Sequence, residues 1–111
     1  MDALCEVVIT GPDAAWLREC TRRLVEARLA ACAQHIAEIR SIYRWEGRVH
    51  DEPEARAMLH TRESLVPEII RAVREAHPYE VPCVLAHLIA HADPDYRAWV
   101  LESTRAPDEA A

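Results

Sequence analysis

The strongest constraint on this chain is an apolar and polar alternation of period two that continues on both sides of one predicted turn. From Ile39 to Glu46, large apolar and charged side chains fall on both faces of an extended segment. Glu46-Gly47-Arg48 can reverse the chain, and the alternation resumes from Glu54 to Thr61. A lone two-stranded ribbon of this kind does not stay ordered in water. The pattern therefore predicts a long protruding hairpin that packs against something else, and a partner subunit is the simplest candidate.

Other elements are predicted on either side of this hairpin. Enrichment in Val and Ile predicts the strands, and apolar residues at three- and four-residue steps predict the helices. Asp13 and Asp93 are the predicted helix caps. The elements are a strand over residues 4–10, a helix over 14–28, a helix that starts at Ser64 and Pro67 and ends at His77-Pro78, a strand over 81–90, and a short helix after Asp93-Pro94.

The predicted order matches the split β-α-β-β-α-β arrangement of ferredoxin-like domains. We therefore expect an α+β sandwich with an extra C-terminal helix and the long hairpin between its second and third strands. With 111 residues and 50% hydrophobic side chains, the chain can build one core. We expect a single domain over residues 1–104 and a flexible tail over residues 105–111.

Composition excludes several classes of function. The net charge is −6, and all 13 basic residues are arginine, which argues against nucleic acid as a partner and removes every lysine-dependent mechanism. Two glycines cannot make a glycine-rich phosphate loop. No long apolar run and no signal-peptide pattern occurs, so we expect a cytoplasmic protein with no membrane partner. The four cysteines show no C-x-x-C spacing and are expected to be reduced.

Four segments together resemble the divalent-cation tolerance (CutA) family, from about residue 5 to residue 104. They are Thr10-Gly11-Pro12-Asp13, Leu29-Ala30-Ala31-Cys32, Ser41-Ile42-Tyr43-Arg44-Trp45-Glu46-Gly47 and His77-Pro78-Tyr79-Glu80-Val81-Pro82, and the closing Tyr96-x-x-Trp99 also fits. The resemblance implies a ferredoxin-like subunit in a tight homotrimer whose hairpins reach across to neighbours. It also implies a role in tolerance to copper and other divalent metals.

The chain departs from this family at the positions that concern metal. The resemblance implies that copper-binding bacterial members use a cysteine before the Thr-x-Pro turn and a His-His pair before Pro-Tyr. This chain has Ile9, Ala76 and His77 at those positions. His60 stands where members commonly have lysine, and Cys83 where they have an acidic residue. The candidate metal ligands are therefore His77 and Cys83, whereas Cys20 and Cys32 are expected to pack in the core.

His77, Tyr79 and Glu80 lie in a short turn that Pro78 and Pro82 restrict. Two interpretations stay open: these groups close the helix end and tie a neighbouring chain by hydrogen bonds, or they line a pocket for a ligand or ion. If subunits meet here, the predicted ligand-binding residues are Tyr43, Arg44, Trp45, Glu46, Arg62, His77, Tyr79, Glu80 and Trp99.

We therefore predict a homotrimeric binding protein that holds divalent cations or a small molecule between subunits, and not an enzyme. No nucleophile with an adjacent base is visible in the sequence. No obligatory cofactor is expected, with copper or another divalent metal as an optional ligand. The alternatives are a small-molecule sensor or signalling trimer that resembles the PII proteins in outline, and an enzyme that uses the inter-subunit His/Tyr/Glu cluster. The physiological ligand and any protein that docks on the hairpin stay open.

Overall fold

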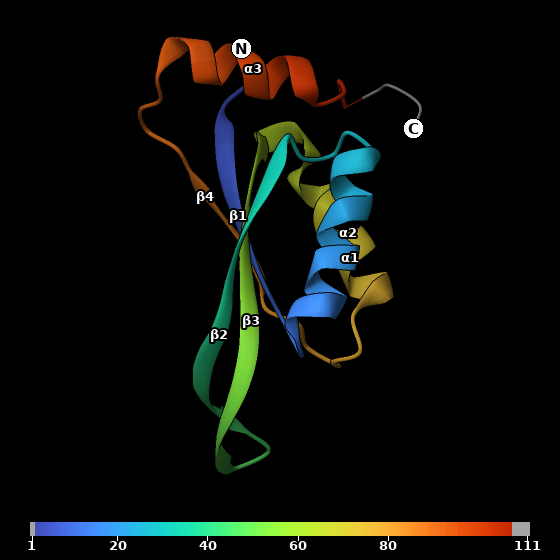
Figure 1. Cartoon of the computed structure of the whole chain (residues 1–111), viewed down its shortest axis with the longest axis vertical. Helices are drawn as coiled ribbons and strands as arrows, with labels where there is room; N and C mark the ends of the chain where they lie inside the picture. The colour runs from blue at the N-terminus through green and yellow to red at the C-terminus, as the bar shows by residue number, and fades with distance from the viewer. Residues whose placement is uncertain (1, 108–111) are drawn as a thin grey trace.

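A computed structural model describes residues 2–107 as one α+β arrangement (Figure 1). In chain order the elements are β1 (Leu4–Gly11), α1 (Ala14–Glu26), β2 (Cys32–Trp45), β3 (Arg48–Arg62), a 3-10 turn (Glu63–Leu65), α2 (Val66–Ala76), β4 (Val84–Leu88) and α3 (Pro94–Ser103). This order confirms the predicted β-α-β-β-α-β unit with a final helix. None of the described helices has both the length and the hydrophobicity needed to cross a membrane.

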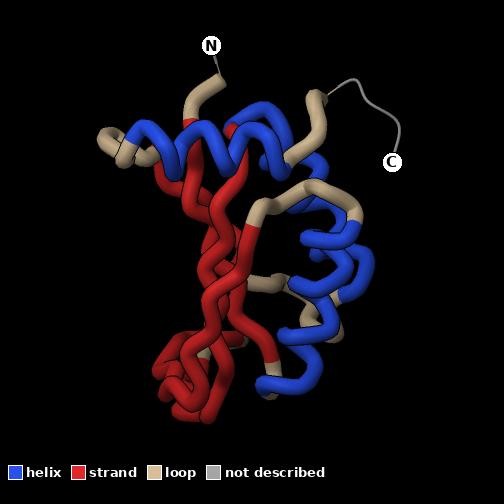
Figure 2. Tube along the Cα trace, turned by 45° about the horizontal axis from the view of Figure 1, so that its top comes forward, coloured by secondary structure: helices blue, strands red, loops and turns tan. Residues whose placement is uncertain are grey.

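The four strands form one antiparallel sheet in the order β2-β3-β1-β4. Helices α1 and α2 cover one face of this sheet, and α3 lies across one end of it (Figures 1 and 2). β1 ends where Gly11 pairs with Ala55, so β3 from Arg48 to Glu54 pairs only with β2. The hairpin therefore extends beyond the rest of the sheet, as predicted. We call the face away from α1 and α2 the open face.

The core lies between the sheet and the two helices that cover it. Every second residue of β3 from Ala55 to Thr61 is buried, and a smaller cluster packs Val100 of α3 against Leu4 and Ala31. The main core consists of Val7, Ile9, Leu17, Leu24, Leu29, Ala30, Ala55, Ala57, Leu59, Leu65, Ile69 and Val73.

A β-bulge in β2 changes which side chains share the open face. Ala37 pairs with Ala55 and Ile39 pairs with Glu54, so Glu38 is an extra residue in the ladder. Beyond the bulge the odd-numbered residues of β2, Tyr43 included, lie on the open face with Glu54, whereas before the bulge the even-numbered residues do. The alternation in the sequence predicted the hairpin but not this switch.

Side-chain caps fix the starts of α1 and α3 as predicted. The Asp13 carboxylate accepts from the Trp16 backbone N–H at 2.8 Å, and Asp93 does the same for Tyr96 at 3.0 Å. Ser64 does not cap α2; its hydroxyl donates to the Asp2 carboxylate instead, and α2 begins at Val66.

Three predicted boundaries differ from the structure. α1 ends at Glu26, two residues early, because Arg28 adopts a φ of 60° that no α-helix continues. β4 covers Val84–Leu88 and not residues 81–90. Arg105 does not belong to a flexible tail, because it is 6% exposed and its backbone N–H donates to the Arg28 carbonyl at 2.9 Å. Packing therefore continues at least to Arg105, and residues 108–111 lie outside the described residues.

Candidate functional site

The hairpin presents its predicted ligand residues near its end, away from the helices. Tyr43 stacks on His50 of the facing strand, with ring centroids 5.1 Å apart, and Trp45 is 37% exposed. Arg44 is exposed, and Glu46 forms the turn with a φ of 49°. These four residues do lie together, where the hairpin pairs with no further strand of residues 2–107.

The turn between α2 and β4 uses His77 as a structural residue. His77 is 8% exposed, and its Nε2–H donates to the Thr10 carbonyl at 2.8 Å. Its Nδ1 accepts from the Tyr79 backbone N–H at 3.2 Å, and its ring packs edge-on against Trp16. Both ring nitrogens are therefore engaged within one chain, which leaves no lone pair for a metal ion. This geometry fits the interpretation that the turn closes the helix end, with the bonds made inside the chain and not to a neighbour.

Two carboxylates that the sequence pattern did not single out connect this turn to the hairpin. Burial, together with the charge of Glu54 and a hydrogen bond to it, raises the pKa of Tyr79 to about 12. Desolvation and the charge of Glu52 raise the pKa of Tyr43 in the same way. Both phenols therefore remain protonated donors at neutral pH. Glu52 and Glu54 carry no distinguishing signal in the sequence, because a polar face of an exposed strand is the usual place for glutamates.

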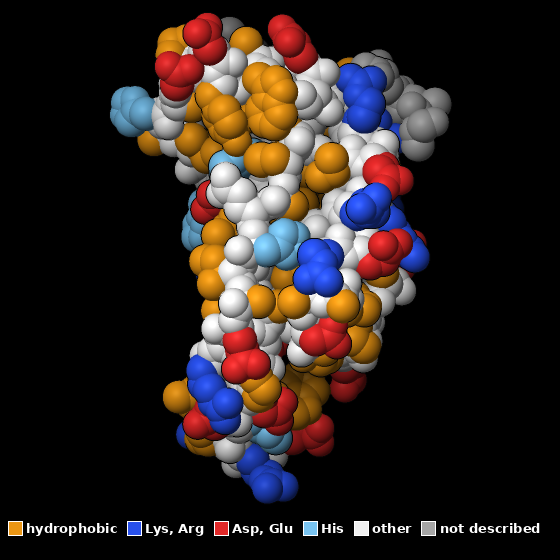
Figure 3. All heavy atoms as spheres, viewed as in Figure 1, with side chains coloured by type: hydrophobic (Ala, Val, Ile, Leu, Met, Phe, Trp, Pro, Cys, Tyr) orange, Lys and Arg blue, Asp and Glu red, His pale blue; other side chains and the backbone are white. Residues whose placement is uncertain are grey.

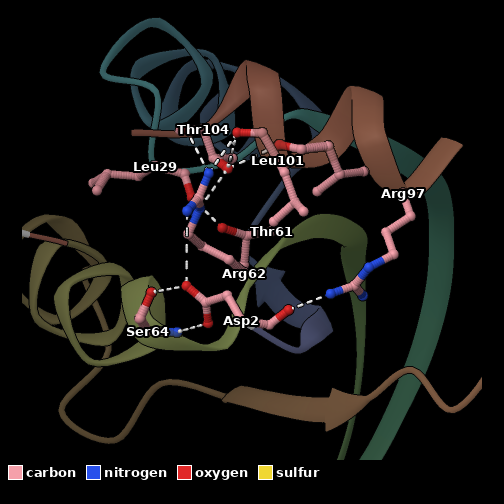
Figure 4. Close-up of polar contacts among 9 residues, drawn as sticks. Asp2, Leu29, Thr61, Arg62, Ser64, Arg97, Leu101 and Thr104 are labelled. Carbon is pink, nitrogen blue, oxygen red and sulfur yellow. Dashed lines mark hydrogen bonds and ion pairs between the residues drawn. The ribbon is translucent and has the colours of Figure 1, made fainter. Parts of the chain in front are cut away.

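Arg62 lies far from this group, and Trp99 belongs to α3, the helix whose end Arg62 contacts. Arg62 pairs with Leu4 at one end of β1, whereas His77 bonds to Thr10 near the other end. The Arg62 guanidinium donates to the Thr104 hydroxyl at 3.0 Å and to the carbonyls of Leu101 and Thr104, where α3 ends (Figure 4). Within one chain, Arg62 anchors α3 and does not reach the turn.

Apolar side chains are exposed on both faces of the hairpin, on the sheet edge and on α3. Figure 3 shows hydrophobic side chains gathered over the upper part of the molecule, and mixed charges over the hairpin end. The exposed fractions reach 69% for Ile42, 63% for Val49 and 64% for Leu88. The full set over residues 2–107 is Ile36, Ile42, Tyr43, Trp45, Val49, Tyr79, Val81, Leu85, Leu88 and Trp99. An apolar surface spread over this many elements is typical of a surface that associates.

A metal centre is not complete within one described chain. Cys83 is exposed, as the sequence predicted. Among residues 2–107, no three His, Cys, Asp or Glu side chains are grouped so that they could hold a metal ion. A site with three such ligands drawn from residues 2–107 would need side chains from a second subunit.

Known proteins are similar to this chain in sequence and in fold. A sequence profile of the family described as CutA1 divalent ion tolerance protein matches residues 5–103. Protein CutA of Mus musculus is 41% identical over 96 residues, which are 86% of this chain and 54% of that protein. The chain thus spans about half the length of this mammalian relative.

Solved structures agree over nearly their whole length. The divalent cation tolerance protein (Cut A1) from Thermus thermophilus superposes with a TM-score of 0.89 at 35% identity, covering 92% of this chain and 99% of that one. The periplasmic divalent cation tolerance protein CutA from Archaeoglobus fulgidus gives a TM-score of 0.87 at 28% identity, covering 90% and 97%. Sequence and fold together show that the chain belongs to the CutA1 divalent ion tolerance protein family.

Proposed function

We propose that this chain is a homotrimeric cytoplasmic binding protein that supports tolerance to copper and other divalent metals. In this proposal an ion or small ligand is held in clefts between subunits, without catalysis and without an obligatory cofactor. The observation that carries the proposal is the exposure of large apolar side chains on the hairpin, on β4 and on α3. The number three comes from the resemblance of the sequence segments to the CutA family.

The sheet edges support association. β2 and β4 are the two edge strands, and each leaves one row of backbone N–H and C=O groups without a strand partner in the described chain. β4 also exposes Leu85 (42%) and Leu88 (64%). A neighbouring strand or hairpin placed along such an edge would satisfy the backbone groups and cover the apolar side chains together.

Charge supports capture of cations. The chain carries −6, so a trimer carries 3 × −6 = −18 before any ion binds. At the hairpin, the His50 Nδ1 lies 3.6 Å from a Glu52 oxygen, and Glu54 lies on the same face of β3. Imidazole suits copper and zinc, and carboxylates suit harder cations. A neighbouring subunit would have to supply the remaining ligands, because no group of three is present among residues 2–107.

Three measurements test this proposal. Calorimetric titration with copper(II) should give at least one site per chain, and fewer sites at micromolar affinity would exclude a dedicated copper site.

Trp45→Ala should weaken the trimer in light scattering, since a large aromatic anchor buries about 150–250 Å². Arg44→Ala, at the adjacent position, is the matched control and should leave the oligomer unchanged. A melting temperature that rises with a metabolite but not with copper would favour the small-molecule sensor instead.

A further inference from the structure

Four polar side chains from four elements meet on the open face, next to α3. Cys32 of β2, His60 of β3 and Glu6 of β1 are in register across the three strands, and Tyr96 reaches them from α3. His60 Nε2 lies 2.9 Å from a Glu6 oxygen, and His60 Nδ1 lies 2.5 Å from the Tyr96 hydroxyl. The Cys32 Sγ lies 3.4 Å from that hydroxyl and 3.6 Å from His60 Nδ1.

These distances define a continuous hydrogen-bonded chain. Burial raises the pKa of Tyr96 to about 12, and the hydrogen bond with Cys32 and the charge of Glu6 act in the same direction. The phenol therefore keeps its single proton at neutral pH and donates it to one neighbour. In the neutral arrangement the Cys32 S–H donates to Tyr96, the Tyr96 O–H donates to His60 Nδ1, and the His60 Nε2–H donates to Glu6.

The same heavy-atom geometry also accommodates the charged arrangement. If the thiol proton passes to Tyr96 and the Tyr96 proton passes to His60, the result is a thiolate and an imidazolium. The imidazolium then donates to Tyr96 from Nδ1 and to Glu6 from Nε2, and the phenol donates to the thiolate. Every donor and acceptor keeps a partner in both states, and Glu6 stabilises the positive imidazole as the orienting carboxylate does in a nucleophile, base and acid triad.

A cavity lies beside the part of this group that His60, Tyr96 and Glu6 form, and Cys32 is not among the residues that line it. It measures about 410 Å³ and is lined by His60 and Tyr96, the two residues that contact Cys32, and by apolar side chains of Leu4, Leu88 and Ile89. Cys32 itself is partly exposed. The titratable groups that face His60 and Tyr96 here are Glu6 from β1, Cys32 from β2, His87 from β4, and His91 and Asp93 from the segment before α3.

We propose that Cys32 is a nucleophilic thiol, activated by His60 through Tyr96, and that it undergoes exchange with small disulfides that reach its partly exposed side chain. The Cys32 proton moves through Tyr96 to His60 Nδ1, and the thiolate attacks one sulfur of the disulfide. A new Cys32 S–S bond forms as the disulfide's own S–S bond breaks. The other half leaves as a thiolate and takes the proton from His60, so Cys32 is oxidised by the disulfide that is reduced. The proposal differs from the expectations that Cys32 only packs and that no nucleophile has an adjacent base.

The test follows each cysteine of the intact protein by mass spectrometry during reaction with 4,4′-dithiodipyridine. The side chain of the exposed Cys83 has no hydrogen-bond partner among residues 2–107 and serves as the reference thiol in the same molecule. The ratio of the Cys32 rate to the Cys83 rate removes the pH dependence of the probe. Because a positioned base contributes about 10²–10⁴-fold in enzymes, we expect this ratio to be at least about tenfold at neutral pH.

Two conservative variants separate activation from packing. His60→Gln keeps hydrogen-bonding groups but removes the base. Tyr96→Phe keeps the ring but removes the hydroxyl relay, so that only the 3.6 Å contact between Cys32 Sγ and His60 Nδ1 remains. His60→Gln should bring the ratio at neutral pH to about one and Tyr96→Phe should lower it, while circular dichroism confirms the fold. A ratio of one or less in the unchanged protein, or a high ratio that persists in both variants, would overturn the proposal.

Discussion

Replacing Arg62 by methionine should destabilise the chain by removing the connection between β3 and the end of α3. The Arg62 guanidinium donates three hydrogen bonds, to the Thr104 hydroxyl and to the carbonyls of Leu101 and Thr104. It also lies 3.8 Å from the Asp2 carboxylate, which accepts from Ser64 (Figure 4). Methionine retains the apolar stem of arginine and removes only these polar contacts.

The expected loss follows from these contacts. A hydrogen bond to a charged group contributes about 1.5–3 kcal/mol when its partner stays buried. Thr104 is 2% exposed, but the Arg62 side chain is 16% exposed, so water can replace part of the loss. We therefore expect a decrease of about 3 kcal/mol in the free energy of unfolding, the equivalent of two of the three bonds. In a domain of this size that lowers Tm by roughly 10–20 °C.

Circular dichroism during thermal and urea unfolding, at one fixed protein concentration, measures this loss. Arg56→Met is the matched control, because Arg56 shares a face of β3 with Arg62 but its side chain has no hydrogen bond or ion pair with any of residues 2–107. The control should change stability by no more than about 0.5 kcal/mol. If Arg62→Met costs no more than Arg56→Met, the anchoring role assigned to Arg62 is wrong.

Three other perturbations have defined outcomes. Desolvation, with the charge of Arg18, lowers the pKa of His35 below 6.5. Unfolding therefore takes up a proton, and the free energy of unfolding should fall as the pH drops below about 6.5. Urea unfolding of His35→Gln at a series of pH values should lack this part of the pH dependence. A Cβ on Gly11 would lie 2.8 Å from the Trp16 ring, so Gly11→Ala should cost about 1–3 kcal/mol in thermal unfolding, and an unchanged Tm would show that the ring can move. His77→Ala should cost about 2–3 kcal/mol and leave copper titration unaltered, whereas normal stability with lost copper binding would return His77 to the ligand site.

The sequence predicted the fold well because its signals are local. Asp13 and Asp93 cap the helices that follow them, and the alternation around Gly47 produces the hairpin. The predictions are wrong where the backbone conformation of one residue, or a contact between distant residues, determines where an element ends or which face its side chains share. The bulge at Glu38 and the positive φ of Arg28 leave no periodic trace in the sequence.

The candidate site was less predictable because its contacts join distant parts of the chain. The turn itself indicates His77 as a ligand, but the bond from His77 to Thr10 spans 67 residues and leaves no local signal. Cys32 and His60 are 28 residues apart, and they become neighbours only through the register of β2 and β3. Nothing in either residue's local sequence distinguishes a thiol beside a base from a thiol in a core.

The proposed trimer depends on one physical claim, that association covers the apolar side chains that one chain leaves in contact with solvent. Sedimentation equilibrium of the unmodified protein over a dilution series tests it most directly. We predict a single species of three times the 12.6 kDa chain mass that persists to high dilution. A folded species at the mass of one chain, with unchanged circular dichroism, would contradict the claim and remove the basis for clefts between subunits.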